Sequence, residues 1–374
     1  MVDIVPVTTR SLRSTFIKLP WKIYKDDPCW VPPLIWERKR SLNPKKNPFF
    51  KYNSAELFLA FKNGEPVGRI SAQVIPRHNK IYKDKTGFFG FFESIDDMEV
   101  SNALFETSSN WLRKQGCDKI LGPMSFTLKD EIGILVEGFG TPPYILNGHN
   151  PHYYAGLMEA CDFKKAKDWY AWHYRVGDLS HEAIQIAEEA RRCPGVEIRS
   201  LDMKRYDADV RLLVDLFNEI WEKHWGFIPF SEEEAIHFAR ELRFFADPEM
   251  VFFVFIHSEP AGFAMTLPNI NELLRHFDGR LFPLHWVKLF RAVTQRRWNS
   301  ARVFAMGIKR AFRGKSLANL SVLLYVETNL RGLKQGYKEA EPSLTLEDNE
   351  SINRGIELMG GKKYKTYRLY EKPL

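Results

Sequence analysis

The 374-residue chain has little cysteine and no long apolar run, and both shortages narrow what it can be. Its four cysteines, Cys29, Cys117, Cys161 and Cys193, lack the spacing of a metal knuckle or a disulfide framework, which favours a reducing environment. The densest apolar run, residues 250–256, is far shorter than the roughly 18 apolar residues that a membrane span needs. The first residues alternate as in a strand and predict no signal peptide. We therefore expect a cytoplasmic protein.

The signatures of several enzyme classes are also missing. The sequence has no Ser-His-Asp order of a hydrolase, no phosphate-binding Walker loop and no triad of metal-ligating residues. We therefore expect no metal ion in the site.

Apolar and basic residues are plentiful. Apolar residues make up 44% of the chain and aromatic residues 14%, so each half can build a core and keep aromatic surface for a ligand. The formal net charge is +7, which favours an anionic partner such as a nucleotide cofactor, an acidic membrane face or RNA. Charge alone does not choose among these partners.

The chain nearly repeats itself. Residues 112–131 read LRKQGCDKILGPMSFTLKDE and residues 333–350 read LKQGYKEAEPSLTLEDNE, so both place Gln-Gly after a helix and before a short strand. A second echo follows, in which Asn150 and Asn349 each precede a glycine by six residues. The offset is far longer than a solenoid repeat of roughly 20 to 50 residues. We infer two homologous domains, divided into residues 1–195 and 196–374.

Local patterns predict mixed α/β structure in both halves. Prolines between residues 21 and 50 exclude one long helix and predict an extended, aromatic-rich loop. Asn63-Gly64 signals a hairpin, and the turn of a second hairpin is predicted at residues 258–260. Strands and helices are expected at residues 55–74, 86–94, 99–115, 196–201, 207–225, 250–268, 301–308, 317–333 and 338–345, with a basic, aromatic insertion at 271–299.

A basic turn joins a strand to a helix in VFAMGIKRAFRGKSLANLSVLL. Such a turn directs free backbone N–H groups and the positive end of a helix dipole at one point, which suits a pyrophosphate. Arg310, Arg313 and Lys315 add positive charge there.

This turn resembles the acyl-CoA-binding motif of the Gcn5-related N-acetyltransferase (GNAT) superfamily, Gln/Arg-x-x-Gly-x-Gly/Ala. Arg313 and Ala318 match the motif, whereas Ser316 stands where its central glycine is expected. The order of hairpin, strand, loop, helix, strand, Asn-containing loop, helix and final strand is also that of the superfamily. The WVPPL and NPFF segments are similar to those of bacterial tandem-domain relatives that have been linked to ceramide synthesis.

The resemblance implies two tandem GNAT-like domains, each with a mixed, mostly antiparallel central sheet flanked by helices. The second would bind acetyl-CoA or a longer acyl-CoA as co-substrate. In the first, the acidic side chains of FFGFFESIDDMEVSN would repel a diphosphate, so we expect no cofactor there. The cofactor-binding residues would be Met306, Gly307, Ile308, Arg310, Arg313, Gly314, Lys315, Ser316, Leu317, Ala318 and Asn349.

Acyl transfer to an amine needs a base for the amine and an acid for the leaving thiolate. The candidates for the base are Glu341, Glu347 and His224. The resemblance places a tyrosine acid on the helix after the Asn-containing loop, but this chain has Leu358 or Met359 there.

Four residues near these segments are candidates for substrate contact, namely Trp221, Trp225, His149 and Tyr153. Ordinary structural roles compete with the functional ones. His224 near the tryptophans can be a packing residue, and an Asn such as Asn349 before an amphipathic run can serve as a helix N-cap.

We predict an acyl-CoA-dependent N-acyltransferase that moves an acyl group from CoA to a primary amine, such as a long-chain or lipid amine. Peripheral contact with the anionic inner face of a membrane is a second expected interaction, whereas the basic turn argues against a nucleic acid. Two alternatives stay open. One is an aminoacyl-tRNA-dependent transferase of the same fold, and the other is a non-catalytic binding protein, which the missing tyrosine and Ser316 support.

Overall fold

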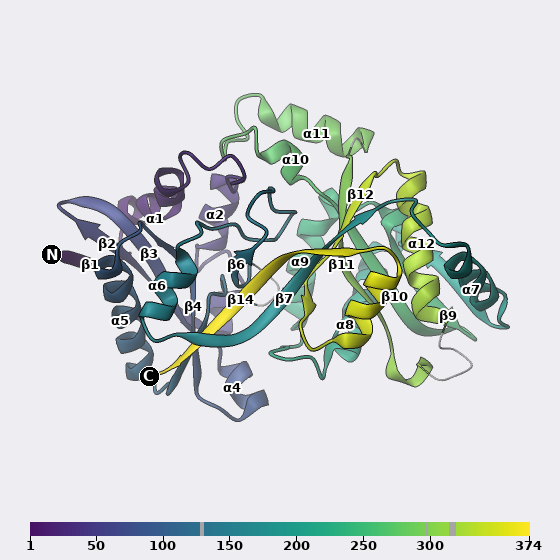
Figure 1. Cartoon of the computed structure of the whole chain (residues 1–374), viewed down its shortest axis with the longest axis horizontal. Helices are drawn as coiled ribbons and strands as arrows, with labels where there is room; N and C mark the ends of the chain where they lie inside the picture. Colours follow the sequence, from purple (N-terminus) through teal and green to yellow (C-terminus); the bar gives the residue numbers. More distant parts are fainter. Residues whose placement is uncertain (128–130, 297, 314–318) are drawn as a thin grey trace. The chain divides into compact units, whose positions relative to one another are not determined.

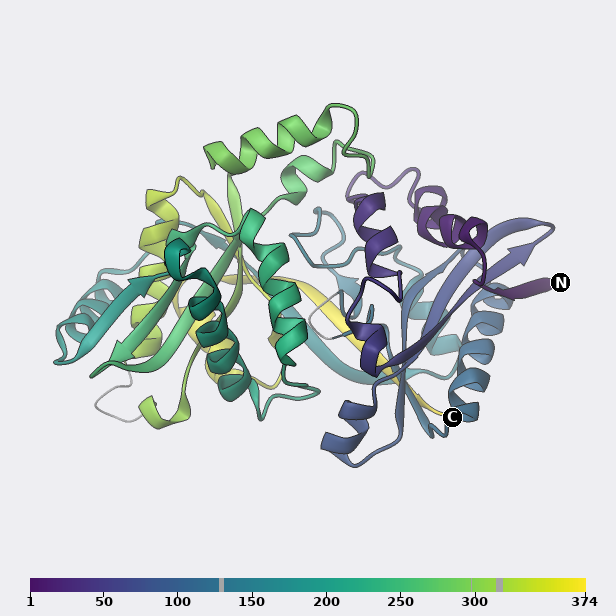
Figure 2. The same cartoon turned by 180° about the vertical axis from the view of Figure 1, so that it is seen from behind.

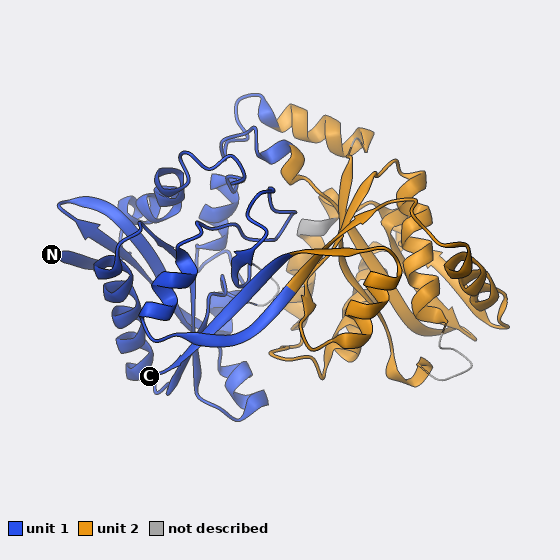
Figure 3. Ribbon diagram, viewed as in Figure 1, with its two compact units in different colours: residues 1–169, 273–285, 365–374 blue, residues 170–272, 286–364 orange. Residues whose placement is uncertain are grey.

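The computed structural model describes residues 1–127, 131–296, 298–313 and 319–374 (Figure 1). Its contacts define two compact units (Figure 3), of which unit 1 holds residues 1–169, 273–285 and 365–374 and unit 2 holds residues 170–272 and 286–364. Strand β7 (Lys164–Arg175) starts in unit 1 and ends in unit 2, whereas β14 (Lys362–Pro373) starts in unit 2 and ends in unit 1. The boundary predicted after residue 195 divides two homologous halves of the sequence. The compact units are defined by contacts instead, so they do not test this boundary and it stays a prediction.

Unit 1 has a sheet with the strand order β1-β2-β3-β4-β5-β14, and β6 also pairs with β14. All these neighbours are antiparallel except β4 and β5. The predicted Asn63-Gly64 hairpin is confirmed, because both residues have the positive φ angles, 55° and 80°, that a type I′ turn requires. The strands are β1 (Val2–Pro6), β2 (Ser54–Lys62), β3 (Glu65–Val74), β4 (Thr86–Ser94), β5 (Lys119–Gly122) and β6 (Ile134–Glu137).

The principal core helix of unit 1 is α5 (Met98–Lys114), close to its predicted position. The Asp97 side chain caps it by accepting from the N–H groups of Glu99 and Val100, and Gly116, with φ 82°, follows its end. Its buried face packs into the aromatic core of the sheet. The other helices described in unit 1 are α1 (Arg10–Ile23), α2 (Ile35–Ser41), α3 (Phe49–Tyr52), α4 (Pro76–Tyr82) and α6 (Tyr154–Ala160), whereas α10 (Asn271–Leu274) starts in unit 2 and ends in unit 1.

The extended loop predicted for residues 21–50 is wrong in part. The end of α1, all of α2 and the start of α3 lie within it. The prolines fall between these helices or directly before one, as Pro48 does, so they divide the segment into short helices without removing helical structure.

Unit 2 has a sheet with the order β7-β12-β11-β10-β9-β8, and β13 also pairs with β7. β12 runs parallel to β11, whereas the pairs from β8 to β11 are antiparallel. The predicted mixed, mostly antiparallel α/β fold is therefore confirmed. The strands are β8 (Val196–Ser200), β9 (Val251–Ile256), β10 (Glu259–Pro268), β11 (Ser300–Ile308), β12 (Glu339–Pro342) and β13 (Thr345–Leu346).

Helices cover both faces of the unit 2 sheet. α7 (His181–Arg192) and α12 (Leu320–Lys334) pack together on the face that carries Phe252, Val254 and Ala264. α8 (Tyr206–Trp221) packs on the opposite face, where its Trp221 contacts Phe263, and α9 (Glu232–Phe245) lies beside it (Figure 2). The remaining helices are α11 (His285–Gln295) and α13 (Glu350–Leu358), with short 3-10 turns at Met203–Arg205, Pro248–Met250 and Arg310–Phe312.

Two features of unit 2 differ from prediction. α8 ends at Trp221 rather than at residue 225, since the chain turns there toward Gly226. The β9–β10 hairpin turns at His257 and Ser258, both with positive φ, rather than at residues 258–260. The predicted start of the next helix at residue 317 lies outside the described residues.

Within the described residues, no helix has both the length and the apolar character to cross a bilayer.

An ion pair between a buried aspartate and a half-buried arginine joins two strands in unit 1. The Asp168 carboxylate, on β7, accepts from Nε and an Nη of Arg368, on β14, at 2.8 and 3.0 Å. Burial by itself raises the pKa of Asp168, but the bonds from Arg368 and Lys165 outweigh it and leave that pKa below its ordinary value. A lowered pKa stabilises the fold above the ordinary aspartate pKa, and this stability is lost as the pH falls through the folded-state pKa.

We therefore expect Asp168→Asn to lower the free energy of unfolding by about 2 kcal/mol at neutral pH. The difference from the unsubstituted chain should vanish in acid, as measured by urea denaturation at several pH values. Glu188→Gln is the control, because its pair with Arg192 is exposed and should contribute little. Equal effects from the two variants would contradict this account.

Candidate acyl-transfer site

The candidate site lies where β11 and β12 separate. β12 pairs with β11 from Ser300 to Val303 only, whereas β10 pairs with β11 as far as Ile308. An irregularity in the β10–β11 register sets in directly after Val303. After Val303, the edge of β11 that faces away from β10 has no strand partner in the part of the chain that the structure describes. Such an edge offers backbone N–H and C=O groups to an extended ligand.

Three predicted cofactor-binding residues, Met306, Gly307 and Ile308, form this free stretch. A Cβ atom at position 307 would lie 2.7 Å from the side chain of Ile220 and 3.3 Å from that of Trp221. Glycine is thus required there so that the end of α8 can pack closely against β11.

The basic turn follows β11 directly. Arg310 is exposed, whereas the Arg313 guanidinium folds back and donates from Nε to the Ile308 carbonyl at 2.8 Å. Burial and then the neighbouring Arg310 lower the pKa of Arg313. Two cations this close favour an anion between them. The remaining predicted residues of the turn, Gly314, Lys315, Ser316, Leu317 and Ala318, lie outside the described residues.

His224 lies in the turn after α8 and stacks on Trp221, with ring centroids 5.6 Å apart. Burial lowers the pKa of His224, and the positive charges of Arg313 and Arg310 lower it further. Its imidazole is therefore neutral at pH 7 and can accept a proton. Trp225 follows in the same turn and is half-buried.

Glu341 is fully buried on β12, opposite Arg302 in the register. Its carboxylate accepts from the Ser343 hydroxyl at 2.5 Å and from the Tyr364 hydroxyl. Arg302 is also buried and donates to the Ser343 carbonyl at 3.3 Å. These contacts fix the direction of the carboxylate next to the point where the strands part.

Asn349 and Glu347 lie in the loop before α13. Asn349 is the N-cap residue, but its side chain makes no capping bond. Asn353, which sequence reasoning missed, holds the loop instead by donating to the Leu346 and Glu347 carbonyls at 2.9 and 3.4 Å. The sequence did contain a signal for Asn353. It lies three residues before the buried Ile356, which places both residues on the same face of the helix.

Tyr325 is a second residue that sequence reasoning missed. It lies on α12, and a Cβ atom at Gly355 of α13 would be 3.7 Å from its hydroxyl oxygen. Burial raises the pKa of Tyr325 to about 12, so the phenol is protonated at neutral pH. Tyr325 thus places a phenol beside α13, although Leu358 and Met359 stand where the family's tyrosine was expected.

The other two substrate candidates, His149 and Tyr153, belong to unit 1. His149 Nε2 lies 2.8 Å from Asp27 Oδ2, and burial lowers its pKa first of all. The Tyr153 hydroxyl donates to the Ser94 carbonyl at 2.8 Å. Their contacts in unit 1 are structural, and a role in substrate binding stays a prediction.

The acidic residues of unit 1 also have structural partners. Glu93 is buried and accepts from the hydroxyls of Tyr24 and Tyr154 and from Arg69. Burial raises the pKa of Glu93, although Arg69 opposes this. Across the described residues, no group of three or more His, Cys, Asp or Glu side chains is placed to hold a metal ion.

Solved structures with the same fold identify the class. A tandem GNAT protein from the clavulanic acid biosynthesis pathway matches with a TM-score of 0.60 and 12% identity, covering 100% of this chain and 98% of that one. A GCN5-related N-acetyltransferase from Sphaerobacter thermophilus matches with a TM-score of 0.55 and 11% identity, covering 99% and 95%. This protein therefore has the tandem GNAT fold.

Curated relatives identify the family. The chain belongs to the family of the bacterial ceramide synthase of Caulobacter vibrioides, with which it is 37% identical over 378 residues, covering 100% of this chain and 98% of the relative. Protein YghO of Escherichia coli is 35% identical over 365 residues, covering 96% and 93%. No protein-family model matches the sequence.

The pKa of His224 can test whether Arg310 and Asp348 lie near its ring, as the structure places them. We expect its pKa to lie below 6.5, to rise in Arg310→Gln, which removes a repelling cation, and to fall further in Asp348→Asn, which removes an attracting anion. Histidine ring resonances followed by NMR from pH 5 to 8 would measure the three values. A pKa that does not respond to either change would show that these groups are not neighbours.

Proposed function

We propose that this chain is an acyl-CoA-dependent N-acyltransferase that acts on the primary amine of a long-chain or lipid molecule. The observation that carries the proposal is the buried, hydroxyl-bonded Glu341 at the point where β11 and β12 separate. The family suggests the acceptor class, because ceramide is a long-chain amine acylated on nitrogen and a relative is named as a ceramide synthase.

The free edge of β11 and the turn after it would hold the donor. An extended pantetheine chain can bond to the backbone of residues 304–308 as an added strand would. Arg310 is exposed and carries the charge to bind the diphosphate. Arg313 stabilises the turn through its bond to Ile308.

Glu341 is the proposed general base. Its carboxylate would accept the proton that the amine nitrogen loses as the new C–N bond forms and the thioester C–S bond breaks. Ser343 and Tyr364 position the carboxylate, and the neutral His224 near the basic turn is the second candidate for this proton transfer.

Tyr325 is the proposed acid, since its phenol can protonate the departing thiolate and its raised pKa keeps it protonated until then. The proposed base and acid approach from opposite faces of the sheet. Ala340 and Pro342, the neighbours of Glu341 on β12, line a pocket together with Tyr325, so the carboxylate between them points to the other face.

We expect acyl-CoA to raise the melting temperature, because a ligand that binds only the folded state stabilises it by mass action. Glu341→Gln should keep this shift and lower kcat for transfer to a long-chain amine by about 100-fold or more. The matched control is Glu339→Gln, which changes an exposed carboxylate two residues earlier on the same strand and should have little effect.

Two results would count against the proposal. If no acyl-CoA shifts the melting temperature, the chain is a binding protein or uses another donor such as aminoacyl-tRNA. If Glu341→Gln transfers the acyl group at the normal rate, Glu341 is not the base.

We also propose that α11 rests on an anionic membrane surface. Trp286 and Phe290 on this helix are 48% and 49% exposed, and Lys288 and Arg291 lie on the same short helix. Exposed aromatic residues with basic neighbours suit the interface of an anionic bilayer.

The double change Trp286→Ser with Phe290→Ser should lower binding to phosphatidylglycerol vesicles about tenfold, as measured by vesicle sedimentation. Leu330→Ser, which removes an exposed leucine from α12, is the control and should bind normally. Equal binding of both variants would exclude α11 as the contact.

A further inference from the structure

The proposed base Glu341 is sealed from solvent. Its side chain is fully buried, and its carboxylate accepts hydrogen bonds from the hydroxyls of Ser343 and Tyr364. A carboxylate that takes a proton from the amine has to release that proton before it can act again. A hydroxyl bonded to it offers a way out, because a hydroxyl can accept one proton while it donates another.

The two bonded hydroxyls differ in their access to solvent. Ser343 is 4% exposed, and the buried Arg302 donates to its carbonyl at 3.3 Å. Tyr364, on β14, is half-buried, and its ring lies edge-on to that of His173, with ring centroids 6.1 Å apart. The His173 side chain is 43% exposed. Of these two hydroxyls, the one on Tyr364 therefore belongs to the side chain that reaches solvent.

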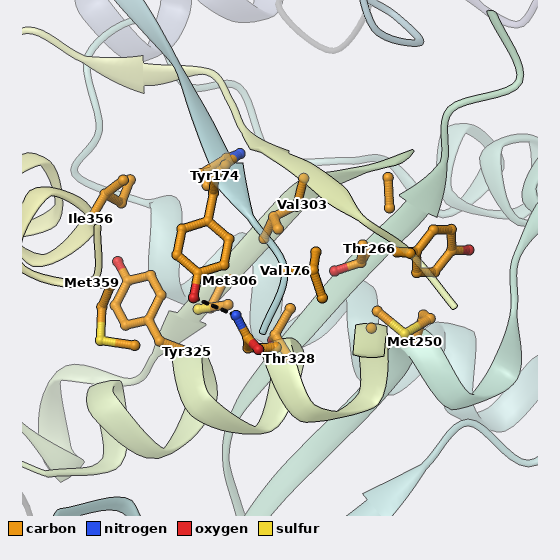
Figure 4. A pocket seen from close by; sticks show the side chains of 16 residues that line it. Tyr174, Val176, Met250, Thr266, Val303, Met306, Tyr325, Thr328, Ile356 and Met359 are labelled. Carbon is orange, nitrogen blue, oxygen red and sulfur yellow. Dashed lines mark hydrogen bonds between the residues drawn. The ribbon is translucent and has the colours of Figure 1, made fainter. Parts of the chain in front are cut away.

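The opposite face of β12 offers no comparable route. Ala340 and Pro342, on either side of Glu341, face a pocket whose wall also includes Val303 and the proposed acid Tyr325 (Figure 4). Among the residues that the structure places on this wall there is no acid, no histidine and no base. A proton on Glu341 therefore does not pass straight to Tyr325, and each of the two groups exchanges protons with solvent on its own face.

We propose that the Tyr364 hydroxyl returns Glu341 to its ionised form after each transfer. This inference rests on the proposed function and adds the residue that resets its base. The protonated carboxyl gives its proton to the Tyr364 oxygen while the Tyr364 hydroxyl passes its own proton to water, so the phenol is neutral before and after. Tyr364 acts through Glu341 and does not touch the substrate.

The protons of the whole cycle balance. The amine loses one proton to Glu341, which releases it to water through Tyr364. Tyr325 gives one proton to the departing thiolate and, being half-buried, regains one from water on the other face of the sheet. The net change is that of the transfer itself, in which the amine loses a proton and the thiol gains one.

Tyr364→Phe should separate the first turnover from the later ones. The first transfer starts with an ionised Glu341, so its rate should fall by no more than about fivefold, for the loss of one hydrogen bond. Later turnovers wait for the proton to leave, so the steady-state kcat should fall by about 50-fold or more. Quench-flow measurement of the CoA released from palmitoyl-CoA, with the long-chain amine sphinganine as acceptor, should show a burst of about one CoA per protein.

Added imidazole should raise the steady-state rate of Tyr364→Phe by about fivefold or more, because a small base in solution can take the proton in place of the missing hydroxyl. This recovery would also show that the variant is folded. Tyr170→Phe is the matched control, since it removes another half-buried phenol, one that lies against Lys363 rather than Glu341, and it should behave as the unsubstituted chain does. Ser343→Ala removes the buried hydroxyl and should slow first and later turnovers alike, without a response to imidazole.

The return of the proton and the reaction itself are tested separately. Equal slowing of first and later turnovers in Tyr364→Phe would mean that Tyr364 only positions Glu341, and would overturn the proposal. A slow phase that imidazole does not accelerate would overturn it too, because product release would then limit the later turnovers. If the unsubstituted protein transfers no acyl group at all, the proposed function itself fails, and the role of Tyr364 with it.

Discussion

Four residue pairs hold β11 against β12, from Ser300 to Val303 on β11, and after them the two strands part. The rest of the candidate site depends on how short this pairing is. Continued pairing to Ile308 would use the backbone groups of β11 that the proposed donor would bind and would bring further side chains over Glu341. Because pairing stops at Val303, one strand edge is free beside a buried carboxylate, and the chain after β11 enters a turn with two arginines.

The alternation of side chains along these strands separates two kinds of chemistry. Arg302 and Glu341 face one side with hydroxyl and carbonyl partners, whereas Val303 and Ala340 face a largely apolar pocket on the other. The two sides of β12 therefore offer different environments to a ligand. The two-residue period of a strand provides this without any special loop.

The fold was largely readable from the sequence because its signals are local. Asn63-Gly64 requires a hairpin whatever surrounds it, and α5 has its cap and its terminal glycine in the sequence. The extended loop at residues 21–50 was mispredicted because proline positions exclude a long helix but not short ones. Ends such as that of α8 depend on packing that a local pattern does not contain.

The candidate site was readable only in part. Glu341 stood out because it lies in a strand between Ala340 and Pro342, where a carboxylate has no ready structural explanation. Tyr325 and Asn353 were missed because each acts across a helix–helix or helix–loop contact, which no spacing in the sequence encodes. The bond from Tyr364 to Glu341 could not be anticipated either, since α13 separates the two residues in the sequence.

The course of β7 and β14 has a consequence for how the protein is made. The sheet of unit 1 ends with β14, whose Tyr370 and Arg368 pair with β5 and β6, yet most of unit 2 lies between these strands in the sequence. On a ribosome that adds roughly 5 to 20 residues per second, β5 and β6 wait for the residues of unit 2 and then β14 to be synthesised before this sheet can close. The sheet of unit 1 is therefore begun before unit 2 and completed after it, and in the meantime the edges of β5 and β6 are open to pairing with other chains.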